Sequence, residues 1–423
     1  MIRFLLILLT GITGSLFLFP VNLPFAPTVN SKMVLAAFGA VVFFLERAQH
    51  KAPSISKDFL VLCIICVIIS IWAFFCTVIN HTTDYAFATY IISVVVWLGA
   101  AYTFTWMIRK VHGKLDVQII GDYLIGICVA QCIVAYAMNL YPGFKQTVNH
   151  IMGFRGGYLD SLRGRLYGIG AALDPAGLRF SGALVINAYS ILHIDFSNHR
   201  IKGALLILSF IIISVFGNMI ARTTSIGMLI GIALLLIVPL ADSKEAKYGA
   251  IWGTAVPLLA AVTILGIWFY NSSGLFRTDF RFGFEGFFSL VEKGRWEVHS
   301  NEILKGMIVW PEQLKTWIVG DGFFDSPRDI PNRMGQVYGG FYMRTDIGYL
   351  RYIFYFGVIG LVGMIAAFTQ MTATCIKGID KSTLLFTSLL LVNLIGWLKV
   401  SSDIVMVFAP FLVLSYMRSE ELT

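Results

Sequence analysis

The chain has 423 residues, of which 57% are hydrophobic and 13% are charged, with a mean hydropathy of +0.77 and a formal net charge of +8. A soluble protein of this length carries about a quarter charged residues, and no single water-soluble core buries so much apolar surface. The composition therefore excludes an ordinary soluble globular protein and predicts a chain whose solvent is the lipid bilayer.

Twelve apolar segments follow one another along the chain, and a helix needs roughly 20 such residues to cross a bilayer. They are 2–19, 31–45, 59–79, 85–108, 117–140, 179–194, 203–220, 224–240, 249–269, 347–368, 383–398 and 403–417. The first segment resembles a signal peptide because Arg3 is followed by apolar residues as far as Phe19. It lacks a small-x-small cleavage site and runs into Pro20 and Pro24, so we interpret it as the first membrane helix.

The six cysteines do not form a disulfide framework. Five of them lie inside apolar segments and Cys375 lies at the edge of one. Cys63 and Cys66 have CxxC spacing, but their flanks are apolar helix rather than a βαβ unit. We interpret them as small buried hydrophobic residues and expect no disulfides in the hydrophilic loops.

The charge of the connectors predicts how the helices are oriented. Five short connectors carry at least two Lys or Arg each: 46–58, 109–116, 195–202, 241–248 and 375–382. They alternate with connectors such as 80–84 that carry none, and basic connectors stay in the cytoplasm. Both termini are then cytoplasmic, and two long segments, 141–178 and 270–346, lie outside. The sequence thus predicts an all-α polytopic membrane protein, a single integral domain over 1–423 with about twelve transmembrane helices.

Arginine is concentrated on the predicted exterior side. In this topology the cytoplasmic side holds five Arg and nine Lys, and the exterior side holds twelve Arg and six Lys. A guanidinium is always charged and binds phosphate or carboxylate through a planar fork, which lysine does not reproduce. The first exterior segment and the helix start after it contain Arg155, Arg163, Arg165 and Arg179 against Asp160 and Asp174. This patch favours an anionic substrate in the membrane plane, such as a polyprenyl diphosphate, and nucleic acid is implausible on that side.

Arg222 occupies a short turn, Ile220-Ala-Arg222-Thr-Thr-Ser225, between two apolar segments. Ionisable groups held at membrane depth are costly, and they usually face a cavity and mark a site. The alternative is that the side chain snorkels to lipid phosphates.

Four motifs line up on the predicted exterior side. They are Arg165-Leu-Tyr-Gly168 with Asp174-Pro175; the Arg222 turn; Gly294-Arg295-Trp296 ahead of Gly320-Asp-Gly322-Phe323; and Thr345-Asp346-Ile-Gly348-Tyr349-Leu350 ahead of Phe356-Gly357 and Gly360-Leu361. In this order and spacing the chain resembles the O-antigen polymerase and ligase superfamily, and in particular the Wzy-type polymerases of bacterial surface polysaccharide. Ligases of this superfamily usually carry a histidine where this chain has Asp346, which favours a polymerase.

The resemblance implies a GT-C-like membrane glycosyltransferase that needs no metal and no cofactor. It would polymerise undecaprenyl-diphosphate-linked repeat units into O-antigen or capsular polysaccharide at the periplasmic face of the bacterial inner membrane. A growing glycan on undecaprenyl diphosphate would be the donor and a new lipid-linked repeat the acceptor. A membrane chain-length regulator is a further expected partner. Guanidinium groups would stabilise the charge on the diphosphate leaving group.

The candidate catalytic residues are Asp346, His299 and Arg295. Arg295 is expected to bind diphosphate or sugar next to Gly294, whose missing side chain lets backbone approach a ligand; the alternative is an ion pair with Glu292 or Glu297. Asp346 is expected to act as acceptor base or to orient an arginine, and N-capping of a helix is its alternative. His299, the one histidine of the large loop, is an alternative base.

The candidate substrate-binding residues are Arg165, Arg179, Arg222, Arg295, Arg344 and Tyr349. Arg165 and Arg179 have anchoring to lipid headgroups as an alternative. Trp296, Trp310, Trp317 and Tyr349 stack on sugars or belong to an interfacial aromatic belt. Asp321 and Asp325 are interpreted as structural rather than as metal ligands.

Two other functions compete with polymerisation. A polysaccharide flippase or other transporter tends to have broken helices and charges at the bilayer midplane. Here the charge is concentrated in two exterior loops, which suits an enzyme better. An O-antigen ligase of the same superfamily, which moves finished glycan to another acceptor, is the second alternative.

Overall fold

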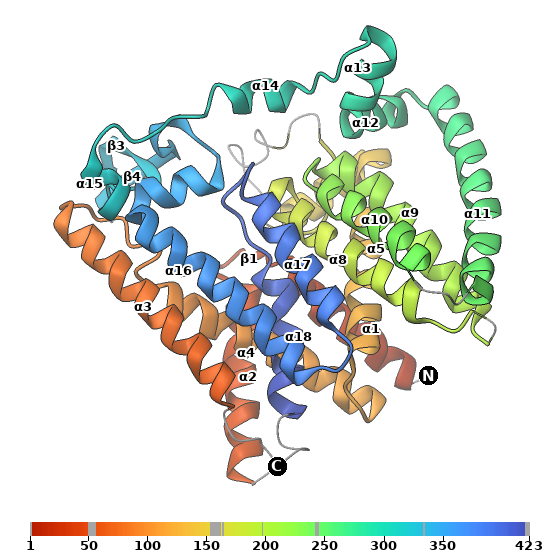
Figure 1. Ribbon diagram of the computed structural model, residues 1–423, viewed down its shortest axis with the longest axis horizontal. Helices are drawn as coiled ribbons and strands as arrows, with labels where there is room; N and C mark the ends of the chain where they lie inside the picture. Colours follow the sequence, from red (N-terminus) through yellow and green to blue (C-terminus); the bar gives the residue numbers. More distant parts are fainter. Residues whose placement is uncertain are drawn as a thin grey trace.

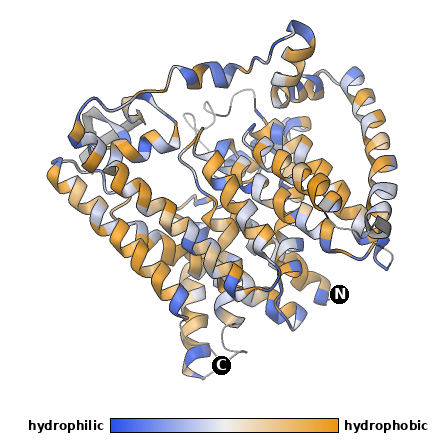
Figure 2. Ribbon diagram, in the orientation of Figure 1, coloured by the Kyte–Doolittle hydropathy of each residue, from blue (hydrophilic) through white to orange (hydrophobic). Residues whose placement is uncertain are grey.

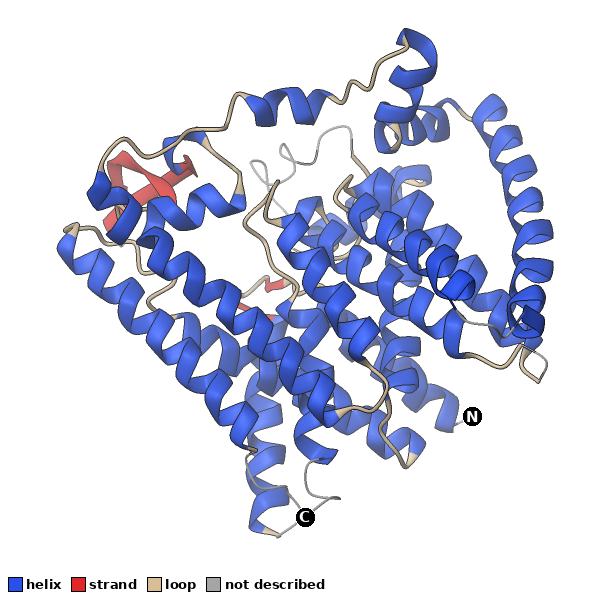
Figure 3. Ribbon diagram, viewed as in Figure 1, coloured by secondary structure: helices blue, strands red, loops and turns tan. Residues whose placement is uncertain are grey.

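The computed structural model describes residues 2–49, 56–152, 162, 165–196, 198–241, 245–332 and 335–418. The described part is almost entirely helical (Figure 1, Figure 3). Each of the twelve predicted apolar segments contains one helix: α1 (Ile2–Leu18), α2 (Ser31–Ala48), α3 (Lys57–Ile79), α4 (Tyr90–His112), α5 (Val117–Leu140), α8 (Leu173–His193), α9 (Arg200–Ile220), α10 (Thr224–Ala241), α11 (Glu245–Ser272), α16 (Gly348–Gly378), α17 (Thr383–Gly396) and α18 (Val405–Arg418).

The largest boundary error of the prediction concerns α16, which continues ten residues beyond the predicted segment 347–368. Non-helical backbone at Phe356 and Gly357 divides it into two stretches. Helix α8 begins at Leu173, six residues before the predicted start, so that Asp174 and Pro175 lie in its first turn. The DP motif therefore opens the helix rather than preceding it.

The remaining elements belong to the long connections. They are β1 (Asn22–Leu23), β2 (Ala26–Asn30), α6 (Pro142–Ile151), α12 (Gly274–Gly283), α13 (Glu285–Lys293), α14 (His299–Lys305), α15 (Leu314–Val319), β3 (Asp325–Asn332), β4 (Gly335–Phe341) and the 3-10 turn η1 (Tyr342–Arg344). The strands form two antiparallel pairs, β1 with β2 and β3 with β4. Within the described chain the predicted exterior segment 270–346 is thus built mainly of short helices and one hairpin.

Within the described residues, six helices are long and apolar enough to cross a membrane: α3, α4, α5, α9, α11 (from Tyr248) and α16. Helix α8 forms the centre of the bundle, and its residues from Ala176 to Leu192 are nearly all buried. The outer faces of the helices are apolar as well (Figure 2). In α3, for example, Ile68 and Ile71 are 58% and 63% exposed. Apolar surface facing outward from long helices fits a bilayer environment.

The connectors gather at the two ends of the bundle. Thr82 and Asn80, in the connector after α3, donate hydrogen bonds to the carbonyls of Gly322 and Gly320 at 2.8 and 3.2 Å. At the opposite end, where both chain termini lie, Lys377 pairs with Asp58 at 2.6 Å (Figure 1). Connectors predicted to lie outside therefore contact one another, and so do basic connectors predicted to lie inside.

Close packing of α8 against α10 fixes the turn that carries Arg222. The Ser181 hydroxyl donates to the Thr223 carbonyl at 2.8 Å and accepts from the Gly227 amide at 3.0 Å. A Cβ at Gly227 would lie 2.2 Å from the Ser181 backbone, and one at Gly177 would lie 2.1 Å from the Thr223 hydroxyl. Only glycine leaves room for this approach.

Gly227→Ala should therefore destabilise the bundle, because backbone of α8 cannot move aside as a flexible side chain can. We expect a cost of about 1–3 kcal/mol, typical of overpacking. It should be visible as a lower unfolding temperature of the detergent-solubilised protein by fluorescence-detected size exclusion. Gly266→Ala in α11, where a Cβ meets nothing within 4 Å, is the control and should be neutral. An unchanged unfolding temperature in Gly227→Ala would contradict the packing.

Candidate active site

The turn that carries Arg222 contacts two segments that are far apart in the sequence. The turn itself is fixed by Thr223, whose hydroxyl donates to the Asp174 carboxylate at 3.1 Å. Arg222 pairs with Glu285 of α13 and lies 4.3 Å from the Phe282 ring centroid, with only 15% of its side chain exposed. Burial lowers the pKa of Arg222, and the Glu285 carboxylate opposes this effect. The structure thus gives Arg222 protein partners facing inward rather than a lipid-facing position.

A small cavity of about 180 Å³ lies beside this guanidinium. Its charged lining comes from segments far apart in the sequence: Arg165, Asp174, Arg222, Asp346 and Lys399. Ile303 and Leu304 of α14 form part of its apolar lining. Three cations therefore meet two carboxylates at the end of the bundle that the sequence predicts to be exterior, and this arrangement can bind an anion.

Asp346 is the carboxylate of this cavity with the most perturbed titration. Burial raises its pKa to about 7, although the nearby Arg351 guanidinium and the Lys399 ammonium oppose the shift. Its side chain is 24% exposed, and its Oδ1 lies 3.8 Å from Nη1 of Arg351. The N-cap of α16 is Ile347, so Asp346 does not cap this helix, which was the structural alternative for this residue. A carboxylate with a pKa near neutrality can accept and release a proton at physiological pH.

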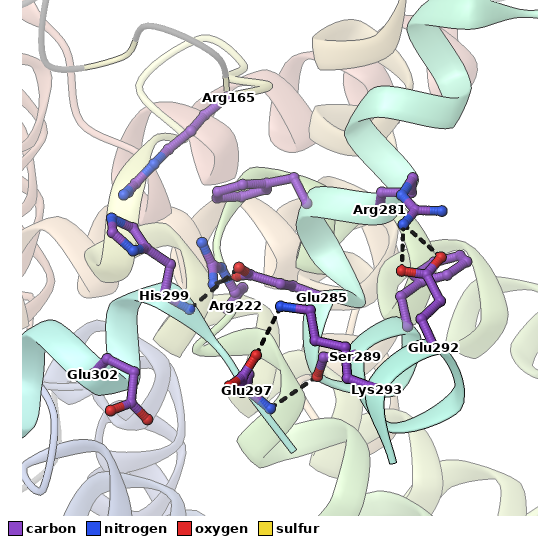
Figure 4. Close-up of a pocket in the computed structure, with 12 residues that line it drawn as sticks. Arg165, Arg222, Arg281, Glu285, Ser289, Glu292, Lys293, Glu297, His299 and Glu302 are labelled. Carbon is purple, nitrogen blue, oxygen red and sulfur yellow. Dashed lines mark hydrogen bonds and ion pairs between the residues drawn. The ribbon is translucent and has the colours of Figure 1, made fainter. Parts of the chain in front are cut away.

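A larger cavity of about 950 Å³ adjoins the small one and shares Arg165, Arg222 and Phe282 with it. Figure 4 shows Arg165 and His299 pointing into the same part of this cavity. The His299 backbone amide donates to Glu285 at 3.2 Å, which ties α14 to the Arg222–Glu285 pair. The cavity is large enough for sugar units, since ligand sites commonly measure about 300–1,000 Å³.

Ion pairs neutralise most of the charge on the walls of the larger cavity. Arg281 pairs with Glu292 at 2.6 Å and Lys293 pairs with Glu297 at 2.7 Å. Arg165 differs from them: within the described residues it makes no ion pair, and its guanidinium lies 5.5 Å from the Phe282 ring centroid. Its charge is therefore available to a ligand at the boundary of the two cavities.

The structure brings together four of the predicted site residues, Arg165, Arg222, His299 and Asp346. The others lie elsewhere. Arg295 is 73% exposed and pairs with Glu297 at 2.7 Å, which is the alternative that the sequence left open. Gly294 ends α13 with φ of 68°, and a Cβ there would meet nothing within 4 Å. The left-handed backbone conformation is itself a reason for glycine at this position.

Arg179, Arg344 and Tyr349 line neither cavity. Arg179 lies in the bundle, 5.8 Å from the Phe19 ring centroid. Arg344 is exposed on η1. The Tyr349 hydroxyl donates to the Leu394 carbonyl at 2.8 Å, inside the bundle. Arg163, with Arg155 and Asp160, lies outside the described residues.

Sequence reasoning missed two cations at the site. Lys399 lies 3.6 Å from Asp174 and stands between two short apolar segments, the same signal that singled out Arg222. Arg351 is only 5% exposed and is the one charged residue of the predicted segment 347–368. A charge inside an apolar segment is itself a signal of function, so both were accessible to sequence reasoning.

Arg351 connects the small cavity to the β3–β4 hairpin. Its guanidinium pairs with Asp325 at 2.6 Å, donates to the Phe324 carbonyl at 2.9 Å and donates to the Ser401 hydroxyl at 2.9 Å. Asp321 accepts a hydrogen bond from Thr316 at 2.8 Å. Asp321 and Asp325 therefore both have structural partners. No group of three His, Cys, Asp or Glu side chains suited to a metal ion occurs in the part of the chain that the structure describes.

The described part of the chain is a helical bundle with six helices long and apolar enough to span a membrane and a charged site at one end. No family model matches the chain, and no curated protein or solved structure shows significant similarity to it.

Proposed function

We propose that this protein is a polysaccharide polymerase of the inner membrane, acting on undecaprenyl-diphosphate-linked repeat units at the periplasmic face. The observation that supports this proposal best is the small cavity lined by Arg165, Arg222 and Lys399 together with Asp346. The cations match a diphosphate, and the carboxylate, whose pKa is about 7, matches a general base.

The proposed reaction is a glycosyl transfer from donor to acceptor. Asp346 accepts the proton of the acceptor hydroxyl, whose oxygen attacks the anomeric carbon of the donor glycan. The bond between that carbon and the diphosphate oxygen breaks, and the electron pair leaves with the diphosphate. Arg222 and Arg165 stabilise the charge that develops there, and fixed cationic groups of this kind are typically the largest contribution to catalysis. The larger cavity holds the sugar units.

The function is tested by analysis of surface glycan in a strain that lacks the gene. A polymerase predicts a single repeat unit on the lipid acceptor, restored to long chains by the wild-type gene. Accumulation of undecaprenyl-linked polymer would instead identify a ligase, and loss of periplasmic lipid-linked repeats would identify a flippase.

The proposal includes twelve membrane spans with both termini in the cytoplasm, so labelling of single cysteines tests it. In a background without the six native cysteines, Val291→Cys on α13 should react with an impermeant maleimide in intact spheroplasts. Lys114→Cys, between α4 and α5, should react only after lysis. The native residues at both positions are exposed, Val291 to 85% and the Lys114 side chain to 71%, so access to reagent is matched. Labelling of position 114 in intact cells with none at 291 would place the site in the wrong compartment.

A further inference from the structure

Helix α11 stands apart from the bundle (Figure 1). Only 6% of its apolar stretch is buried, against 33–56% in the other five long apolar helices. Between α11 and the pair α9 and α10 runs a groove of about 460 Å³. Its walls include Phe210 and Ser214 of α9, Met228 of α10, and Trp252 and Leu259 of α11.

The groove is suited to a hydrocarbon chain. Among its lining residues only Ser214 and Trp252 carry polar side-chain atoms. The lining positions of α11 run from Ile251 to Leu259, which at 1.5 Å per residue gives a length of roughly 12 Å along the helix. Its upper lining position on α10, Met228, lies less than two helical turns from Arg222.

The upper end of this groove adjoins the charged site. Phe284 lines the groove, its neighbour Glu285 lines the larger cavity and pairs with Arg222, and Phe282 lines both charged cavities. Two other apolar grooves lack this continuity. The groove of about 600 Å³ lies among α2, α3, α4 and α18, and the one of about 690 Å³ between α1 and α5 includes His112 and Asp122.

We propose that the groove between α9, α10 and α11 binds the first isoprene units of the polyprenyl chain whose diphosphate occupies the site at Arg165 and Arg222. This inference rests on the proposed function, which supplies the lipid-linked substrate. A polyprenyl diphosphate has an anionic head joined to an apolar tail. In the protein, the cationic site at Arg165 and Arg222 is likewise followed by an apolar groove. Lipid tails are as apolar as the groove, so the selectivity comes from packing of the methyl-branched chain rather than from a hydrophobic driving force.

The test uses full-length purified protein and equilibrium binding of undecaprenyl diphosphate and inorganic diphosphate, measured by isothermal titration calorimetry. Ala255→Trp fills the groove from α11. It should weaken binding of undecaprenyl diphosphate by about tenfold, because the chain loses its packing contacts. Binding of inorganic diphosphate should not change. Leu259→Trp, at a position that is 55% exposed, is a second variant in case the first fails to fold.

Ala40→Trp, in the apolar groove between α2 and α4, is the matched control and should leave both affinities unchanged. Equal affinity for undecaprenyl diphosphate in the wild type and both groove variants would overturn the inference and assign the groove to ordinary lipid acyl chains. An equal loss in Ala40→Trp would overturn it too. The binding measurement does not require catalysis. If the groove variants lost affinity for undecaprenyl diphosphate tenfold but the wild-type protein formed no polymer, the assignment of the groove would stand and the proposed polymerase function would be wrong.

Discussion

Asp346→Asn should lower the rate of polymer formation from purified lipid-linked repeats by at least about 100-fold, the usual contribution of a general base. The amide preserves the shape of the side chain but cannot accept a proton. The pKa of Asp346 is raised to about 7, so the carboxyl is protonated and inactive below that pH and ionised above it. The wild-type rate should therefore rise as pH increases through about 7 and then level off, whereas the residual rate of Asp346→Asn should lack this transition.

Rates of polymer formation measured between about pH 5 and 9 test whether Asp346 is the base, since a base with a pKa near neutrality produces its inflection within that range. Asp380→Asn, an exposed carboxylate at the opposite end of the bundle, is the control and should follow the wild-type profile. If Asp346→Asn kept the same inflection, the titrating group would be another residue, with His299 as the first alternative.

Arg222→Ala should reduce polymer formation by roughly 30- to 1,000-fold at normal membrane abundance, because it removes a preorganised cation from the leaving group. Arg222→Lys should fail nearly as badly. Lysine is a point charge, and it cannot bind two oxygens through a planar fork as a guanidinium does. The measurement is the chain-length distribution of surface glycan together with the rate on purified repeats.

The ion pair with Glu285 gives Arg222 a structural role that must be separated from ligand binding. In the double variant Arg222→Ala/Glu285→Gln no unpaired carboxylate is left, so folding should recover if the pair is structural. We expect the double variant to fold and to remain inactive. Recovery of polymer in it would reduce Arg222 to a structural residue.

Arg295→Ala is the matched control for Arg222→Ala. It also tests whether the sequence or the structure identifies the functional arginine correctly. The sequence favours Arg295 as a ligand, whereas the structure places it 73% exposed and paired with Glu297. We expect Arg295→Ala to keep long polymer. Loss of polymer in Arg295→Ala with full activity in Arg222→Ala would support the sequence-based assignment instead.

Hydropathy predicted the helices well because a long run of apolar residues leaves a strong signal in the sequence. Boundaries were worse where a helix includes polar residues beyond its apolar segment, as at Asp174 in the first turn of α8 and after Phe368 in α16. The short helices and hairpin of 270–346 were not predicted, since their apolar periodicity is too brief to register.

A lone cation between or within apolar segments was the signal that identified one residue of the candidate site. Two other cations with the same signal were not singled out. Arg222 was found by this signal, and Lys399 and Arg351 were not. Which arginines share a cavity depends on tertiary contacts such as Phe282 with Arg165 and Arg222, and no spacing in the sequence reports these contacts. That is why Arg165 and Arg295 looked equivalent in the sequence and lie in different surroundings in the structure.

The central claim is that cationic side chains and Asp346 join lipid-linked repeat units. The most direct test is purified protein in liposomes, supplied only with the undecaprenyl-diphosphate-linked repeat in the presence of EDTA. We predict a ladder of glycan chains and one undecaprenyl diphosphate released for each linkage formed, with Arg222→Ala and Asp346→Asn inactive. A protein that forms no chains from this substrate, or that forms them only after magnesium or manganese is restored, would contradict the account.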